Sequence, residues 1–308
     1  MNRKVAVVGA GNVGASVAQY IAETNLADVV MVDILEGIPQ GKALDLTQAG
    51  PVRMYNAHVT GTNDYKDIEG ADLVVMTAGL ARKPGMSRED LLKANADIVG
   101  GAADNIKKFA PKSFVIVVTN PLDIMTYHMF KRTGFKANRV CGQAGILDSI
   151  RFRAFVAMEL GVAMTDVQAM VLGGHGDTMV PLPRYTTVGG VPIGELISAE
   201  RIKAISDRTR DGGAEIVKLL KSGSAYYAPA AATVEMVKAI LLDEKRVVPL
   251  SAYLTGQYGM KDLYIGVPAV LGAHGVEKIL ELKLGKDELE LLQKSGQTYK
   301  GFLKEIGY

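Results

Sequence analysis

The sequence is poor in cysteine and close to neutral in charge. Its single cysteine, Cys141, cannot form an internal disulfide, so a reducing compartment fits the chain. No histidine lies near Cys141 in the sequence, which favours a small buried residue over a catalytic thiol. The 35 basic and 33 acidic residues give a formal net charge of +2. This balance argues against nucleic acid or an anionic membrane surface as a partner, but a local basic cluster could still bind a small anion.

The sequence also lacks long hydrophobic runs, and none approaches the length of a membrane span. Asn2, Arg3 and Lys4 followed by the apolar stretch Val5–Val8 could be read as a short signal peptide. The same residues are typical of a buried first strand that leads into a glycine-rich turn, and we favour this interpretation. We therefore expect the protein to stay in the cytoplasm.

The first half of the chain alternates short apolar runs with helical patterns. The runs are aliphatic or β-branched and almost free of charge, as in strands covered on both faces. Strands are expected at Lys4–Val8, Val29–Asp33, Asp72–Thr77 and Phe114–Thr119, with weaker candidates at His58–Thr60 and Arg139–Cys141. Helices are expected between them, as at Val13–Leu26, Arg88–Phe109 and Leu122–Arg132. This alternation predicts an α/β fold with a doubly wound parallel sheet.

The pattern changes after about Leu147 to a mixture of helices and strands. Helices are expected at Ile146–Leu160, Ser198–Leu220, Ala228–Leu242 and Asp287–Ile306. Strands are expected at Val167–Leu172, Arg246–Leu254 and Leu263–Leu271, and a hairpin at Tyr185–Ile193. The sequence therefore predicts two domains, residues 1–146 and a mixed α+β substrate domain of residues 147–308. We expect them to pack as one rigid unit, because no flexible linker separates them.

A glycine-rich motif follows the first expected strand, with the sequence Gly9-Ala10-Gly11-Asn12-Val13-Gly14. Alone it is weak evidence, but a helix follows it, and Asp33 ends the next strand 19 residues after Gly14. Gly9 would make the tight turn, Gly11 would let the backbone approach a pyrophosphate, and Gly14 would let the helix pack on the strand. The helix N-terminus would offer N–H groups to the phosphates. These features predict a Rossmann-type dinucleotide-binding domain.

Asp33 and two later turns complete the expected cofactor site. The Asp33 carboxylate would accept hydrogen bonds from the ribose hydroxyls and repel a 2′-phosphate, so NAD is expected in preference to NADP. Met76–Gly79 and Val118–Pro121 both follow apolar strands, which places them at the ligand edge of such a sheet. The candidates in the second turn are Val118, Thr119 and Asn120. The amide of Asn120 suits a nicotinamide ribose or a substrate oxygen, but an ordinary turn residue before proline remains an alternative.

The chain has four histidines: His58, His128, His175 and His274. His175 alone follows an apolar strand and stands between glycines that would expose its ring, so it is the candidate general acid or base. Asp148 and Arg151 are three residues apart on one face of a helix, and a surface ion pair would explain them. Their apolar neighbours instead indicate a buried helix, where both charges need partners. Asp148 is therefore the candidate carboxylate that orients His175.

A basic loop, residues 79–88, follows the strand expected at Asp72–Thr77. It contains three cations, Arg82, Lys83 and Arg88. The loop could be a solvated surface segment, or a lid that closes over an anionic substrate and excludes water.

In combination these motifs resemble the lactate/malate dehydrogenase family, and within it the lactate-dehydrogenase-like enzymes that act on malate. The resemblance runs from Lys4 to near the C-terminus. Its motifs, besides the glycine loop, are Ala-Arg-Lys-Pro-Gly-Met-Ser-Arg, Val-Thr-Asn-Pro, Leu-Asp-Ser-Ile-Arg-Phe-Arg and Gly-Gly-His-Gly-Asp. The resemblance implies an NAD-dependent enzyme of the tricarboxylic acid cycle that oxidises (S)-malate reversibly to oxaloacetate. It also implies a homotetramer or a dimer, and it implies no metal.

The resemblance further implies roles for individual residues. His175 would accept the substrate proton with Asp148 as its partner, and Arg151 would hold the C1 carboxylate as a two-pronged pair. Arg88 would polarise the C2 oxygen when the lid closes. Asn95 would contact the cofactor.

Substrate choice depends on the basic loop in this interpretation. Arg82 would bind the second carboxylate, and Asn120 would contact both substrate and cofactor. Lactate dehydrogenases typically have a neutral Gln where Arg82 stands, and a Thr near Ser224-Ala225. Both departures favour a dicarboxylate. The alternatives are a lactate or other 2-hydroxyacid dehydrogenase, and a non-catalytic NAD-binding protein with the same fold.

We predict that Asp33→Ser weakens NAD binding and improves the relative use of NADP. The change removes both the acceptor for the ribose hydroxyls and the charge that repels a 2′-phosphate. The measurement is kcat/KM for the two cofactors in the wild type and the variant. An unchanged preference would show that Asp33 does not select the cofactor.

Overall fold

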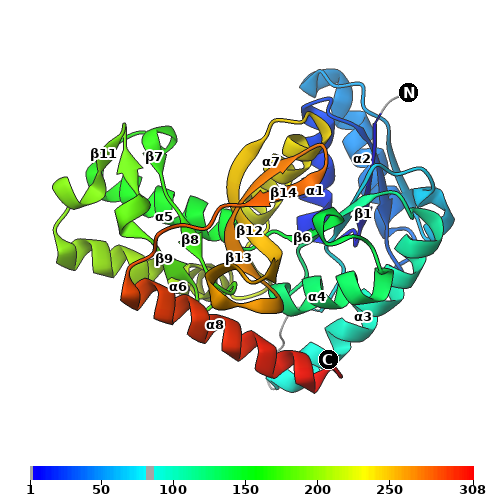
Figure 1. Cartoon of the computed structure of the whole chain (residues 1–308). Coiled ribbons are helices and arrows are strands. Elements are labelled where there is room, and N and C mark those ends of the chain that lie inside the picture. The colour runs from blue at the N-terminus through cyan, green and yellow to red at the C-terminus, as the bar shows by residue number, and fades with distance from the viewer. Residues whose placement is uncertain (1–2, 81–86) are drawn as a thin grey trace.

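The computed structural model describes residues 3–80 and 87–308. Arg82 lies outside these residues, and the side chain of Arg88 is also not described. One nine-stranded sheet crosses the molecule, in the order β14-β13-β12-β6-β5-β4-β1-β2-β3. In Figure 1 the early strands β1 and β2 lie at one side of the molecule, and helices cover the sheet on both faces.

The first six strands are parallel, and helices connect most of them. The strands are β1 (Lys4–Val8), β2 (Asp28–Val32), β3 (Val59–Thr62), β4 (Leu73–Met76), β5 (Phe114–Val117) and β6 (Val140–Gly142). The helices are α1 (Asn12–Glu23), α2 (Ile38–Arg53), α3 (Arg88–Phe109) and α4 (Leu122–Thr133). The strand order β3-β2-β1-β4-β5-β6 is that of a doubly wound Rossmann sheet, which confirms the predicted fold class.

The burial of successive residues in β1 explains why its sequence is apolar after Lys4. Val5 and Val7 belong to one buried cluster, with residues of α1 and α7, and Ala6 and Val8 belong to a second cluster, with residues of α3 and α4. Both faces of the strand are therefore covered from Val5 to Val8, and its only charged residue, Lys4, stands at the less buried start.

The sheet continues into the second half of the chain through antiparallel strands. They are β12 (Arg246–Thr255), β13 (Lys261–Gly272) and β14 (Gly275–Ile279), and β12 joins the parallel part through the pair Ser251–Gly142. The strand β14 was not expected from the sequence. The sheet contains strands from both sides of residue 146, so backbone hydrogen bonds join the two proposed domains directly. The domain boundary at that residue stays a prediction.

The second half also contains four long helices and two small sheets. The helices are α5 (Gly145–Leu160), α6 (Ala199–Leu220), α7 (Tyr227–Leu241) and α8 (Lys286–Glu305). The short strands are β7 (Val167–Gln168), β8 (Val171–Leu172), β9 (Val180–Pro181), β10 (Thr187–Val188) and β11 (Val191–Pro192). Short 3₁₀ turns are η1 (Tyr65–Ile68), η2 (Ala137–Arg139), η3 (Met164–Asp166), η4 (Pro183–Tyr185), η5 (Ile193–Glu195) and η6 (Gln257–Gly259). The helix α8 runs along one side of the molecule, below both halves (Figure 1).

The single strand predicted at Val167–Leu172 is wrong. The segment forms two strands, because β7 pairs with β10 while β8 pairs with β9 in another sheet. The predicted hairpin is confirmed by the antiparallel pairing of β10 with β11. Among the residues that the structure describes, no helix is long and apolar enough to cross a membrane.

The motif glycines differ sharply in the space around them. A Cβ on Gly14 would lie 1.9 Å from the carbonyl oxygen of Gly9 and 2.9 Å from Thr77 Oγ1, so α1 packs directly on the turn after β1. A Cβ on Gly11 would meet nothing within 4 Å. Gly9 has φ +102°, a left-handed conformation that a side chain rarely adopts.

We predict that Gly14→Ala lowers the free energy of unfolding by about 1–3 kcal/mol, because the methyl group overpacks a closed contact. The matched variant Gly11→Ala should change it by less than about 1 kcal/mol, since its methyl group enters open space. Urea unfolding of both variants checks this. Equal losses for the two substitutions would contradict the packing argument.

Candidate active site

The loop after β1 forms a site that fits a phosphate group. Gly11 caps the N-terminus of α1 without a side-chain hydrogen bond, and the first turn of the helix carries no acidic residue. The exposed backbone at Gly11 and Asn12 therefore offers N–H groups and the positive end of the helix dipole to an anion. Ala10 is buried behind the turn, and Val13 is partly buried at the start of the helix.

Asp33 follows β2 and lies beside this loop. Its Oδ2 accepts the backbone N–H of Ala10 at 2.6 Å, and its Oδ1 accepts that of Leu35 at 3.0 Å. Lys42 Nζ donates to the carbonyl oxygen of Ala10 at 2.7 Å. The carboxylate is thus held next to the glycine loop, where ribose hydroxyls would reach it. Sequence reasoning missed Lys42, which no local pattern distinguishes from a surface lysine.

Asn95 lies on α3 and is 0% exposed. Its Oδ1 accepts the N–H of Leu80 at 2.7 Å, and its Nδ2 donates to the carbonyl oxygens of Leu80 at 3.1 Å and Asn120 at 2.7 Å. The amide therefore joins the turns after β4 and β5. The cofactor contact expected of Asn95 stays a prediction, since in this geometry its polar atoms serve the backbone of the two turns.

The turn after β5 carries the other candidate residues. Thr119 is buried and donates to the carbonyl oxygen of Ala78 at 2.8 Å, Val118 is partly buried, and Asn120 is exposed. A Cβ on Gly79 would lie 2.5 Å from Thr119 Cγ2, so the two turns pack tightly together. Their position at the carboxyl ends of parallel strands is where such folds bind ligands.

His175 and Asp148 form a buried pair in the second half of the chain. His175 follows β8, Asp148 lies in the first turn of α5, and His175 Nδ1 is 3.0 Å from Asp148 Oδ2. Their side chains are 13% and 2% exposed. A carboxylate can only accept, so Nδ1 carries the hydrogen and Nε2 is left to exchange a proton with a substrate.

Electrostatic effects on His175 oppose one another. Burial lowers the pKa of the imidazole, but the charge of Asp148 and its hydrogen bond raise it more, so the pKa of His175 lies above its ordinary value. Arg151 opposes this increase, because a second cation disfavours the imidazolium. The net effect favours the protonated ring more than in solution.

Arg151 extends from α5 to the same cluster. Its Nη1 lies 3.5 Å from Asp148 Oδ1, and its side chain is 12% exposed. Its Nε is buried with no hydrogen-bond partner among the described residues. A Cβ on Gly212 of α6 would lie 3.3 Å from Arg151 Cδ, so this glycine leaves room for the side chain. Burial lowers the pKa of the guanidinium, and the cation lacks the partners that a bound carboxylate would supply.

The remaining predicted residues belong to the basic loop. Arg82 lies outside the described residues, and Arg88 is the first residue of α3. Ser87 caps this helix and accepts the N–H of Asp90 at 3.0 Å. The structure thus brings together His175, Asp148 and Arg151, and it describes only the backbone position of Arg88.

The other three histidines lie elsewhere. His274 is exposed in the turn between β13 and β14, and His58 is exposed before β3. His128 Nδ1 lies 2.8 Å from the hydroxyl of Tyr308, and burial lowers its pKa. None of them pairs with Asp148.

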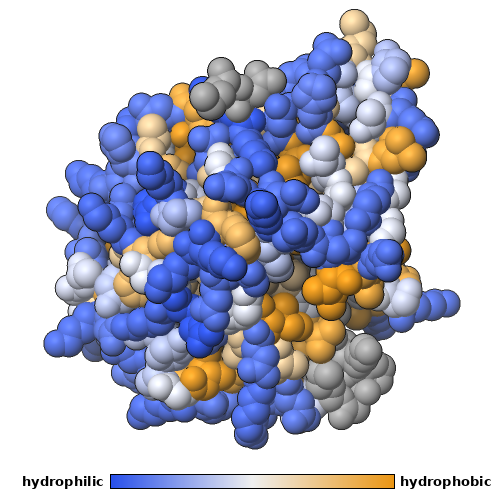
Figure 2. Space-filling view, turned by 90° about the vertical axis from the view of Figure 1, so that its right-hand side faces the viewer, coloured by the Kyte–Doolittle hydropathy of each residue, from blue (hydrophilic) through white to orange (hydrophobic). Residues whose placement is uncertain are grey.

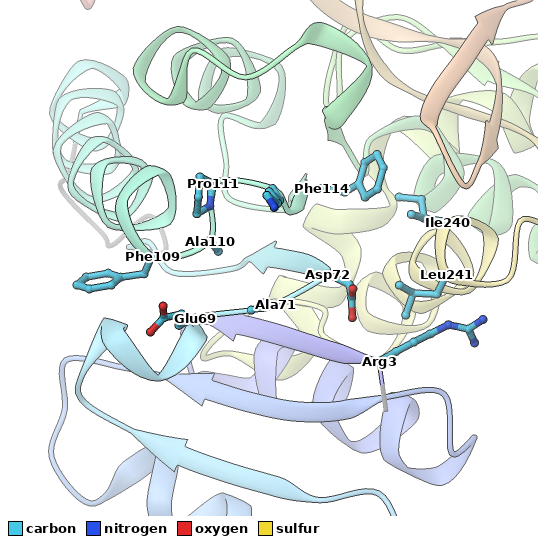
Figure 3. A pocket seen from close by; sticks show the side chains of 12 residues that line it. Arg3, Glu69, Ala71, Asp72, Phe109, Ala110, Pro111, Phe114, Ile240 and Leu241 are labelled. Carbon is cyan, nitrogen blue, oxygen red and sulfur yellow. The ribbon is translucent and has the colours of Figure 1, made fainter. Parts of the chain in front are cut away.

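Two pockets in the described part of the chain lie at the amino ends of the strands, at the edge opposite the glycine loop. The larger has a volume of about 570 Å³, and Figure 3 shows Arg3, Asp72 and Leu241 among the side chains around it. The residues that line it include no histidine, so it holds no pair like that of His175 and Asp148. Within residues 3–80 and 87–308, no group of three or more His, Cys, Asp or Glu side chains could hold a metal ion.

Comparison with known proteins agrees with this geometry. Residues 3–142 match the family model of the lactate/malate dehydrogenase NAD binding domain, and residues 146–306 match that of the lactate/malate dehydrogenase alpha/beta C-terminal domain. Malate dehydrogenase from Roseiflexus sp. (strain RS-1) is 57% identical over 298 residues, 97% of this chain and 96% of its own length. That from Methanosarcina mazei is 57% identical over 303 residues, 98% of this chain and 99% of its own length.

Solved structures of lower sequence identity share the whole fold. The crystal structure of Cryptosporidium parvum malate dehydrogenase has a TM-score of 0.97 and 44% identity, covering 99% of each chain. The lactate dehydrogenase of the same organism, in complex with lactic acid and nicotinamide adenine dinucleotide, has a TM-score of 0.96 and 46% identity, covering 100% of this chain and 99% of its own. Both enzymes share the fold, so the fold alone does not select a substrate.

The fold and the site together define an oxidoreductase that uses NAD. This chain belongs to the lactate/malate dehydrogenase family. The open backbone at Gly11, the uncapped start of α1 and the carboxylate of Asp33 fit the cofactor.

We predict that His175→Asn keeps NADH binding and lowers kcat by about 10²- to 10⁴-fold, the usual contribution of a positioned acid or base. The matched variant His274→Asn should keep near-normal kcat, because this residue is exposed between β13 and β14. NADH fluorescence titration and steady-state kinetics provide the two readouts. Near-normal turnover in His175→Asn would exclude it as the acid/base group.

Proposed function

We propose that this protein is an NAD-dependent malate dehydrogenase, which oxidises (S)-malate to oxaloacetate and catalyses the reverse reduction. The proposal is carried by the buried cluster of His175, Asp148 and Arg151, in which an acid/base group lies beside an incompletely paired cation. Relatives named malate dehydrogenase at 55–57% identity over nearly the full chain support it. We also propose that residues 1–146 bind the cofactor and that residues 147–308 carry most of the catalytic site.

The proposed reaction begins with Arg151 binding the C1 carboxylate of malate. Its planar guanidinium suits a two-pronged pair, and Nε is available for one of the two hydrogen bonds. Neutral His175 removes the proton of the C2 hydroxyl at Nε2, because Nδ1 donates to Asp148. Asp148 then stabilises the imidazolium. Bound NAD supplies the hydride acceptor.

Three further residues complete the proposed site. Arg82 binds the second carboxylate of the substrate, and Arg88 stabilises charge on the C2 oxygen during reduction of oxaloacetate. Asn120, which is exposed after β5, contacts substrate and cofactor.

The proposed acid/base chemistry gives opposite pH dependences for the two directions of the reaction. Malate oxidation needs neutral His175 and increases as the pH passes its raised pKa, whereas oxaloacetate reduction needs the protonated ring and decreases.

We propose that the protein forms a homo-oligomer, a tetramer or alternatively a dimer, in the cytoplasm. Large apolar side chains at both ends of α2 support association, since Ile34, Val52 and Met54 are 90%, 84% and 85% exposed. Figure 2 shows one side of the molecule, where apolar patches alternate with hydrophilic side chains. The formal net charge of +2 gives no reason to propose nucleic acid or a membrane as a partner. The substrate suggests a place in the tricarboxylic acid cycle.

A lactate dehydrogenase is the second candidate, because a solved enzyme of that name is 46% identical to this chain. Initial rates of NADH oxidation with oxaloacetate, pyruvate and 2-oxoisocaproate separate the two. We expect oxaloacetate to be strongly preferred. A preference for pyruvate would overturn the malate assignment while leaving the acid/base pair intact.

We predict that Arg82→Gln lowers kcat/KM for oxaloacetate by roughly 30- to several-thousand-fold. Truncating one member of a buried charge pair costs about 2–5 kcal/mol, and about 1.4 kcal/mol corresponds to a factor of ten. Pyruvate activity should rise modestly, because a cation no longer faces the methyl group. The measurement is kcat/KM for both oxo acids.

Arg132→Gln provides a matched control, since Arg132 forms a surface ion pair with Asp104 at the far end of α4. Its ratio of oxaloacetate to pyruvate activity should equal that of the wild type. If the ratio of oxaloacetate to pyruvate activity barely changes in Arg82→Gln, Arg82 does not determine the choice of substrate.

A further inference from the structure

The peptide group of His175 is held from both sides by residues distant in the sequence. Its N–H donates to Asp123 Oδ2 at 2.9 Å, and its carbonyl oxygen accepts the hydroxyl of Tyr299 at 2.9 Å. The N–H of the preceding Gly174 donates to Ser295 Oγ at 2.9 Å. A Cβ on Gly174 would lie 1.8 Å from the ring of Tyr299, so only glycine fits there. The catalytic loop is thus clamped between α4 and α8.

Asp123 is the charged member of this clamp. It lies in the first turn of α4 and is 1% exposed. Its Oδ1 accepts the hydroxyl of Ser251 on β12 at 2.6 Å, and its Oδ2 accepts His175 N–H. No cation pairs with this carboxylate in the described part of the chain. A buried carboxylate with only two hydrogen bonds is costly, and a neutral amide could make similar contacts.

The charge of Asp123 acts on the same imidazole as that of Asp148. The charged groups that face His175 are Asp148 and Arg151 from α5 and Asp123 from α4. The hydroxyl of Tyr299 comes from α8, and that of Ser251 from β12. Burial raises the pKa of Asp123 to about 6, and hydrogen bonds from Ser251 and His175 oppose the shift. Both carboxylate oxygens accept a hydrogen bond, an arrangement that favours the ionised form.

We propose that Asp123 is a second carboxylate of the catalytic site, a positioning residue that holds the His175 backbone and stabilises its imidazolium together with Asp148. Asp148 orients the ring and neutralises it directly. Asp123 fixes the main chain from which the ring extends and adds negative charge without touching substrate. The inference rests on the proposed function only in that His175 is the acid/base group.

The test uses Asp123→Asn in the full-length protein. Asparagine keeps an acceptor for His175 N–H, and the Ser251 hydroxyl can rotate to accept from the new amide, so the clamp survives while the charge is lost. We expect the pKa of the His175 ring to fall by about 0.5–1 unit. ¹⁵N NMR titration of the ring, assigned by comparison with His175→Asn, measures this without turnover. In the pH profile of kcat/KM for malate oxidation, the rise that follows deprotonation of His175 should move to lower pH by the same amount.

Two control variants separate charge from structure. Asp72→Asn removes a carboxylate that accepts Lys4 N–H at 2.8 Å before β4, at the opposite edge of the sheet. We expect it to leave the His175 titration unchanged. Tyr299→Phe breaks the carbonyl side of the clamp without changing any charge, so kcat should fall while the pKa of His175 stays the same.

The proposal is overturned if Asp123→Asn folds and the pKa of His175 moves by less than about 0.2 unit. If that variant fails to fold, Ser251→Ala replaces it, because loss of the hydroxyl raises the pKa of Asp123 and should still lower that of His175. An unchanged titration in Ser251→Ala would then reject the proposal. Since the NMR readout needs no substrate, absence of malate turnover would count against the proposed function and not against the role of Asp123.

Discussion

The hydrogen bond between His175 and Asp148 is the interaction on which the site depends. It joins the first turn of α5 to the loop after β8, at 3.0 Å and almost out of contact with solvent. A carboxylate this deeply buried is costly unless it is hydrogen-bonded or paired, and Arg151 and His175 are the partners of Asp148. The same contact determines which ring nitrogen can exchange a proton. Removing Asp148 would therefore leave an arginine without a partner as well as a histidine without an orientation.

The fold meets this requirement by bringing distant segments to one place. The central sheet continues from the parallel strands into β12, so Ser251 and the α4 residue Asp123 face each other. The helix α8 spans both halves and holds the backbone of the histidine loop through Tyr299. Asn95 joins the turns after β4 and β5 in a similar way. The polar side chains of Asp123, Tyr299 and Asn95 thus hydrogen-bond to neighbouring strands and loops and hold these elements in position.

Much of the fold is predictable because its signals are local. The strand Lys4–Val8 buries apolar side chains on both faces. Glycine is required at position 14 because a Cβ there would collide with the carbonyl oxygen of Gly9, five residues earlier. The Asp148 candidate also comes from spacing within one helix. Contacts such as that of Tyr299 with His175, 124 residues apart, have no local signature. The helix α2, with Pro51 inside it, and the two strands within Val167–Leu172 were missed because their periodicity is weak.

The central claim is that His175 donates through Nδ1 to Asp148 and exchanges protons through Nε2. The most direct measurement is the ¹⁵N NMR spectrum of the His175 ring in the protein without substrate, recorded over a pH series. The account predicts the neutral tautomer with hydrogen on Nδ1 and a pKa above that of an ordinary histidine. A neutral tautomer with hydrogen on Nε2, or a pKa below the ordinary value, would contradict it.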